Sequence, residues 1–242
     1  MFEKGLRSPI WDHLKELRKR LIFMIIGFFV CVVVSFLFTN WIINFLTEPI
    51  GGLENLQAIE VTESLNVYVK VALLSGFILS LPWIVVQILI FILPGLTSKE
   101  KKWIFIFVPL ATMFFLSGAV FSFYIMMPPA LEFMTEFLMV ETNVRLKNYI
   151  DFVTSLLFWV GLSFESPLVV FVLAKIKLVN ARMLLKGWRI AIVVIAILAA
   201  IITPTGDPVN MALLMAPLLV LYMLSILMAK FANKSNESKN GV

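Results

Sequence analysis

Long, unbroken runs of apolar residues constrain this chain more than any other feature of its sequence. Several are about 20 residues long, the length that a helix needs to cross the hydrocarbon core of a bilayer. Hydrophobic residues make up 61% of the 242 residues, and charged residues only 14%. A water-soluble fold of this size could not hide so much apolar surface. Because the runs are continuous rather than alternating, they favour helices over a barrel. The sequence predicts an all-α polytopic membrane protein.

Six segments fit membrane crossings. We expect one membrane domain over residues 1–232 and a disordered, Asn/Ser/Lys-rich tail at 233–242. We expect the fifth and sixth helices to be short, and the third crossing to stop at Pro128-Pro129. The stretches between crossings that follow Pro49 and Pro129 are expected to form short helices. The expected crossings are 21–43, 65–93, 103–127, 149–173, 190–202 and 209–229.

Lysine and arginine are distributed unequally among the segments between these crossings. The N-terminal segment, the second and fourth connections and the tail hold 17 of them, whereas the first, third and fifth connections hold 2. The positive-inside rule then predicts that both termini are cytoplasmic and that the chain is a multi-pass protein of the cytoplasmic (inner) membrane. The net charge of +5 is explained by this topology and by contact with anionic lipid, so we expect no nucleic-acid partner.

The sequence offers no pattern typical of an enzyme. It contains one cysteine, Cys31, and one histidine, His13, so neither has a second residue of the same type with which to bind a metal ion. No nucleophile–base pair or metal-spaced set of ligands is visible. We therefore expect no catalytic residue, no metal and no cofactor.

Glu165 is the outstanding polar residue of the predicted crossings. It lies near the middle of the fourth, in the segment Ser163-Phe164-Glu165-Ser166-Pro167. A carboxylate at that depth is costly, and this favours a functional role in proton exchange or in polar contact with another membrane segment. The alternative is a protonated Glu165 that hydrogen-bonds a neighbouring helix. Pro167 removes a backbone donor, which frees the Ser163 carbonyl and predicts a kink.

Three further acidic residues have ordinary structural explanations. Glu16 precedes the first crossing on an amphipathic stretch, and its spacing from Arg20 predicts a local i,i+4 ion pair. Glu100 lies among lysines, which also predicts a surface ion pair. For both Glu16 and Glu100, the functional alternative is that the carboxylate accepts a guanidinium from a partner. Asp207 precedes the sixth crossing and is expected to cap that helix.

Six short motifs in this order resemble the TatC family, the core receptor subunit of the twin-arginine protein translocase. The resemblance covers nearly the whole chain, and it is the order of the motifs within a six-crossing chain that makes it specific. The motifs are His13-Leu14-x-Glu16-Leu17-Arg18-x-Arg20-Leu21, Pro49, Pro82 with Gln87, Phe91-x-x-Pro94-Gly95-Leu96-x-x-x-Glu100, Gly161-x-Ser163-Phe164-Glu165-x-Pro167 and Thr203-Pro204-x-x-Asp207-Pro208.

The resemblance implies a receptor that recognises twin-arginine signal peptides and helps to export folded proteins, driven by the proton-motive force. It implies TatA-type and TatB-type single-span partners and a homo- or hetero-oligomer. Glu16 and Glu100 match the family's two cytoplasmic acids that receive the signal's arginines, and Leu17, Arg18, Phe91 and Pro94, from the same motifs, are expected to bind the signal peptide with them. Glu165 and Gln87 are implied as intramembrane polar contacts for a partner, Thr203, Pro204 and Asp207 as an outer turn, and Pro49 as structural in the first outer loop.

The sequence departs from the family pattern at two positions. Met211 stands where the family often has Gln after the turn acid, and Met223 stands where it often has an acid after Leu221-Tyr222. Two other functions compete with the receptor: a proton-coupled small-solute transporter that uses Glu165, and a scaffold without a ligand. A transporter should show internal repeats and polar residues along several crossings, which this sequence does not display.

Overall fold

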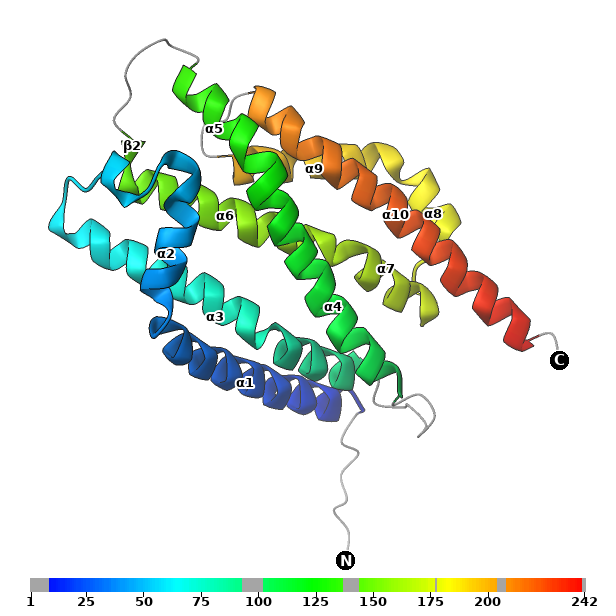
Figure 1. The fold of residues 1–242 in the computed structure, drawn as a ribbon. Coiled ribbons are helices and arrows are strands. Elements are labelled where there is room, and N and C mark those ends of the chain that lie inside the picture. Colours follow the sequence, from blue (N-terminus) through cyan, green and yellow to red (C-terminus); the bar gives the residue numbers. More distant parts are fainter. Residues whose placement is uncertain (1–8, 93–101, 137–143, 177, 204–207, 241–242) are drawn as a thin grey trace, which may run out of the picture. The chain divides into compact units, whose positions relative to one another are not determined.

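The structure is a computed structural model, and it describes residues 9–92, 102–136, 144–176, 178–203 and 208–240 (Figure 1). Five of the helices among these residues are long and apolar enough to cross a membrane, and α9 is a shorter apolar helix. The described chain is therefore an all-α membrane fold. The helices are α1 (Pro9–Phe36), α2 (Thr39–Thr47), α3 (Val61–Ile92), α4 (Lys102–Phe121), α5 (Met127–Glu136), α6 (Leu146–Phe164), α7 (Ser166–Lys175), α8 (Ala181–Lys186), α9 (Trp188–Ile202) and α10 (Pro208–Asn240).

The chain divides into two compact units, each described here by itself. The first comprises residues 1–43 and 68–113, and the second comprises residues 44–67 and 114–242. Short elements in the second unit are η1 (Glu48–Ile50), η2 (Leu53–Asn55), the π-helical segment η3 (Ser122–Met126), β1 (Leu56–Gln57) and β2 (Val144–Arg145).

In the first unit, α1 lies along α3 because small residues let the two helices approach closely. A Cβ added at Gly76 of α3 would lie 2.7 Å from the Val32 Cα of α1, so no side chain fits there. The Ser35 and Ser75 hydroxyls bond each other across the same seam, and the Tyr68 hydroxyl donates to the Phe36 carbonyl at 3.0 Å. Small residues and polar bonds of this kind hold helices together where lipid offers no hydrophobic driving force.

In the second unit, α10 packs along α7 and also contacts α8 and α9. Ala174, Ala229 and Ala232 are fully buried at the α7–α10 contact, which again places small residues where backbones meet. A close approach also joins the end of α4 to α6, since a Cβ at Gly118 would lie 2.9 Å from the Gly161 Cα. The Tyr222 hydroxyl of α10 donates to the Leu184 carbonyl of α8 at 2.6 Å.

Two helix ends differ from the sequence-based expectations. The third run does not stop at Pro128-Pro129: α4 passes through the π-helical segment into α5, which ends at Glu136. The missing N–H groups of Pro128 and Pro129 fall directly after the π-helical segment, where the regular i→i−4 hydrogen bonding is already interrupted. The expected amphipathic stretch after the prolines is thus part of a longer helical run.

The last helix is the other departure. α9 is short, as expected, at 15 residues, but α10 has 33 residues and continues to Asn240. The expected disordered tail is therefore helical as far as Asn240. No proline or glycine interrupts residues 218–240, so a helix that has already nucleated in the apolar part can propagate into the polar part.

Candidate functional site

The charged end of α1 carries the first group of expected site residues. The Glu16 side chain is 33% exposed, and its Oε1 lies 3.6 Å from Nη2 of Arg20, one turn further along the helix. The i,i+4 ion pair expected from the sequence is thus present. Leu17 and Arg18, which flank Glu16 in the same motif, are both exposed.

Arg20 also links this end of α1 to α3. Its Nη1 donates to Oε1 of Gln87 at 3.3 Å, and Gln87 is buried at 4% exposure. Glu16, Arg20 and Gln87 therefore form one polar cluster across two helices. The sequence pointed to Glu16 and Gln87 separately, whereas the arginine that joins them was visible only as the partner of Glu16.

The seam between α1 and α3 fixes the position of this cluster. Trp83, one turn before Gln87, donates its Nε1–H to the Phe23 carbonyl of α1 at 2.9 Å. A Cβ at Gly27 would run into the Trp83 indole, so glycine is needed where the ring crosses α1. Phe91, also expected at the site, is half-buried near the end of α3. Pro94 and Glu100 lie outside the described residues.

The expected intramembrane acid lies at a break between two helices. α6 ends at Phe164 and α7 begins at Ser166, with Pro167 in the first turn of α7. Pro167 has no N–H to give the Ser163 carbonyl, and this accounts for the interruption that the sequence predicted. Glu165 is half-buried, and its Oε1 is a buried atom without a hydrogen-bond partner among the described residues.

The expected outer turn is described only in part. Thr203 is buried at 5% exposure, and its hydroxyl donates to the Ala199 carbonyl at 2.9 Å, which closes the end of α9. Pro204 and Asp207 lie outside the described residues, so the predicted cap of the sixth helix remains a prediction. Pro49 lies in η1, in its first turn, and is exposed.

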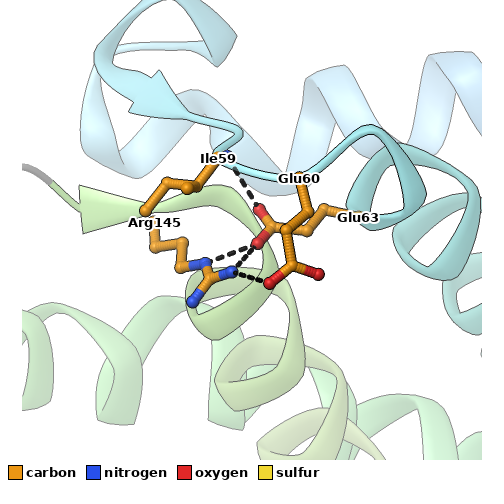
Figure 2. A network of polar contacts seen from close by, with 4 residues as sticks. All are labelled: Ile59, Glu60, Glu63 and Arg145. Atoms are coloured by element: carbon orange, nitrogen blue, oxygen red, sulfur yellow. Dashed lines mark hydrogen bonds and ion pairs between the residues drawn. The ribbon is translucent and has the colours of Figure 1, made fainter.

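A polar network that the sequence did not predict joins the first and third connections (Figure 2). The Arg145 guanidinium pairs with the Glu63 carboxylate, and its Nη2 lies 3.1 Å from Oε1 of Glu60. The Ile59 N–H donates to the second Glu63 oxygen at 3.3 Å. The Glu63 carboxylate raises the pKa of Arg145 above its ordinary value.

The same two connections pair through their backbones. β1 and β2 run parallel, with Leu56 opposite Val144 and Gln57 opposite Arg145. Close by in sequence, the buried Tyr149 hydroxyl of α6 donates to the Leu46 carbonyl of α2 at 2.7 Å. The available signal in the sequence was that the first connection holds four glutamates and no Lys or Arg, whereas the third holds Arg145 and Lys147 beside three glutamates of its own.

Within the described part of the chain, no group of three or more His, Cys, Asp or Glu side chains is placed to hold a metal ion. The polar features described above include the Glu16–Arg20–Gln87 cluster, the Glu165 break and the Arg145 network. Their carboxylate and guanidinium groups can take part in recognition by charge and hydrogen bonds.

Comparison with known proteins places the chain in a family. Residues 12–217 match the family model described as "Sec-independent protein translocase protein (TatC)". The Sec-independent protein translocase protein TatC of Deinococcus radiodurans is 36% identical over 232 residues, covering 92% of this chain and 86% of that protein. The protein of the same name from Carboxydothermus hydrogenoformans is 35% identical over 225 residues, covering 92% of this chain and 93% of that protein.

Solved structures give the same result for the fold. A crystal structure of the twin-arginine translocase receptor TatC superposes with a TM-score of 0.81 at 34% identity, covering 91% of this chain and 99% of that one. A second crystal structure of this receptor, in DDM, gives a TM-score of 0.82 at 33% identity, covering 90% of this chain and 99% of that one. The match extends over nearly the full length of both chains, so this multi-pass membrane protein belongs to the TatC family of Sec-independent protein translocase proteins.

Proposed function

We propose that this protein is the signal-peptide receptor of a twin-arginine translocase, which exports folded proteins across the cytoplasmic membrane using the proton-motive force. The observation that carries the proposal is the position of Glu16. It is a half-exposed carboxylate at the basic end of α1, and it already pairs with a guanidinium from its own chain. A guanidinium from a signal peptide would meet the same acceptor.

The charge distribution supports a cytoplasmic position for this site. The N-terminal segment that leads into α1 holds six Lys and Arg residues, and the first connection after it holds none. Under the positive-inside rule, the Glu16 end of α1 faces the cytoplasm, where precursor proteins are made. Both termini are then cytoplasmic if α9 crosses the membrane together with the five longer helices.

The chemistry of arginine explains why a carboxylate would select it. The guanidinium is planar and presents a rigid fork of donors that fits both oxygens of a carboxylate, whereas lysine offers a compact point charge. Glu16 supplies one such acceptor. The family resemblance assigns a second to Glu100, so that two acids would receive two arginines.

The comparisons favour this receptor over a proton-coupled transporter. Curated relatives that match over nine-tenths of the chain bear the name of a translocase protein. Glu165, the residue on which the transporter alternative rested, then takes another role. We propose that the α6–α7 break presents Glu165 to a single-span TatA-type or TatB-type partner, since its buried Oε1 has an unused hydrogen-bonding capacity.

The receptor role is tested by photo-crosslinking a signal peptide to the full-length protein in membranes. An Arg-Arg peptide is compared with a Lys-Lys peptide on wild type, Glu16→Ala and Glu100→Ala. Glu54→Ala is the matched control, because Glu54 is an exposed acid of the first connection. We expect crosslinks that need both arginines, weaken in the first two variants and persist in the control. Equal labelling by both peptides in every variant would contradict the receptor role.

The role of Glu165 is tested with two substitutions that separate its charge from its capacity to form hydrogen bonds. Glu165→Gln keeps a polar group that can bond a partner, whereas Glu165→Ala removes it. We expect Glu165→Gln to retain co-purification of the single-span partner and Glu165→Ala to weaken partner binding about threefold, the effect of one interhelical hydrogen bond in a membrane. If both variants weaken binding equally, the ionised carboxylate, not a hydrogen bond, makes the contact.

A further inference from the structure

Arg20 places a guanidinium of the protein itself on the acid that is proposed to bind signal arginines. Its Nη2 lies 3.6 Å from Oε1 of Glu16, and its Nη1 lies 3.3 Å from Oε1 of Gln87. Its side chain is 24% exposed, and its Nε is buried without a hydrogen-bond partner among the described residues. One arginine thus divides its donors between acceptors on two helices.

This division leaves the contact with Glu16 weak. Charge-assisted hydrogen bonds between guanidinium and carboxylate are usually about 2.7–2.9 Å long and often bidentate. Arg20 reaches Glu16 at 3.6 Å, because its other terminal nitrogen is directed to Gln87. A second guanidinium that approached Glu16 with its full fork would make the better pair.

We propose that Arg20 is a built-in competitor of the signal peptide, which occupies Glu16 and gives it up to an arginine of the signal. The inference rests on the proposed receptor function and concerns the regulation of the same site. Gln87 makes the exchange possible, because it keeps one hydrogen bond to Arg20 while Glu16 changes its partner. A displaced Arg20 is therefore not left as a charge without an acceptor, which would be costly at a partly buried position.

The competitor lowers the affinity of Glu16 for any incoming cation by the same factor, because each must replace the same Arg20–Glu16 pair. The preference for arginine over lysine comes from the incoming group itself, since an arginine makes bidentate bonds to the freed carboxylate and a lysine makes a single contact. Arg20 therefore weakens binding of both peptides equally and leaves the difference between them unchanged.

The test measures the Kd of labelled Arg-Arg and Lys-Lys peptides for the full-length protein in lipid nanodiscs. Arg20→Gln is compared with Lys19→Gln, which removes the same charge from an exposed neighbouring position. We expect Arg20→Gln to bind the Arg-Arg peptide about two- to fivefold more tightly, the value of a partly exposed ion pair. We expect the same fold gain for the Lys-Lys peptide, so that the ratio of the two Kd values is unchanged. Lys19→Gln should give a smaller gain for both peptides, because it removes the same charge without freeing Glu16.

For a second variant, Gln87→Leu, we expect the opposite change in affinity. Gln87→Leu removes the acceptor that retains Arg20, so displacement becomes harder and we expect weaker binding of the Arg-Arg peptide. The double variant Arg20→Gln/Gln87→Leu should bind as tightly as Arg20→Gln alone. Arg20→Lys, which keeps the charge but not the fork, should fall between wild type and Arg20→Gln.

The possible results separate this inference from the receptor function. If wild type prefers the Arg-Arg peptide but Arg20→Gln binds like Lys19→Gln or more weakly, Arg20 is not a competitor and only this inference fails. If wild type shows no preference between the peptides and Glu16→Gln changes nothing, the receptor function itself fails.

Discussion

Arg145 joins segments that are far apart in the sequence. It contacts Glu63 across a separation of 82 residues and Glu60 across 85. Glu63 is 1% exposed, whereas Glu60 is 63% exposed, so the two contacts differ in environment. A buried carboxylate depends on its partner far more than an exposed one does.

Removing the guanidinium should therefore destabilise the protein by leaving Glu63 buried and unpaired. We expect Arg145→Met to lower the melting temperature of the protein in detergent, and Glu60→Gln to lower it much less. The double variant Glu63→Gln/Arg145→Met should recover part of the loss, because it no longer buries an unpaired charge. Equal melting temperatures for wild type and Arg145→Met would show that the pair contributes no net stability.

At the scale of helices, the α1–α3 seam determines where the polar cluster lies. Glu16 and Arg20 belong to α1, and Gln87 belongs to α3, so their geometry depends on the separation of these two helices. Gly76 sets that separation near Val32. A Cβ added at Gly76 would lie 2.7 Å from the Val32 Cα and 2.9 Å from the Val32 backbone nitrogen. These are backbone atoms of α1, which cannot move aside as a side chain would.

A methyl group at this position should force the helices apart. We expect Gly76→Ala to destabilise the protein by about 1–3 kcal/mol, the usual cost of overpacking, and to reduce crosslinking of the Arg-Arg peptide at Glu16. Gly187→Ala is the control, since its Cβ would meet nothing closer than 3.4 Å. The comparison is made by unfolding in detergent. An equally stable Gly76→Ala protein with unchanged crosslinking would show that the seam has room to adjust.

At the scale of the whole molecule, the expected topology is set by the number of crossings. The described helices include five long enough to cross, and the sixth crossing depends on α9. With 15 residues, α9 is about 22 Å long, against a hydrocarbon core of about 30 Å. Whether α9 counts as a crossing decides on which side the end of α10 lies.

This topology can be tested by labelling single-cysteine variants in intact cells. Cys31, the one natural cysteine, is first replaced by alanine, and Glu54→Cys, Arg182→Cys and Lys230→Cys are then made one at a time at exposed positions. We expect a membrane-impermeant maleimide to label Glu54→Cys in intact cells, and to label the other two only after permeabilisation. Labelling of Lys230→Cys in intact cells would mean that α9 does not cross.

Much of the fold was predictable because a bilayer leaves the chain few choices. Backbone groups in hydrocarbon must be satisfied within each segment, so a long apolar run predicts a helix without knowledge of its neighbours. The third and sixth helices still differed from expectation, because a boundary depends on local backbone geometry. Pro128 and Pro129 fall directly after a π-helical segment, where the i→i−4 hydrogen bonding is already interrupted, and α10 continues through a polar segment that composition alone assigned to disorder.

Parts of the site could be predicted where a single residue or a spacing within one helix indicates them. Parts that consist of contacts between distant residues could not be predicted. The sequence by itself determined the all-α membrane class, the unusual carboxylate at Glu165 with the break before Pro167, and the i,i+4 pair of Glu16 with Arg20, since each follows from hydropathy or from spacing along one helix. Only the tertiary structure decided that Arg20 also binds Gln87 and that Arg145 joins Glu60 and Glu63. These contacts connect residues more than 60 positions apart, and such pairs depend on how helices pack, which no local pattern records.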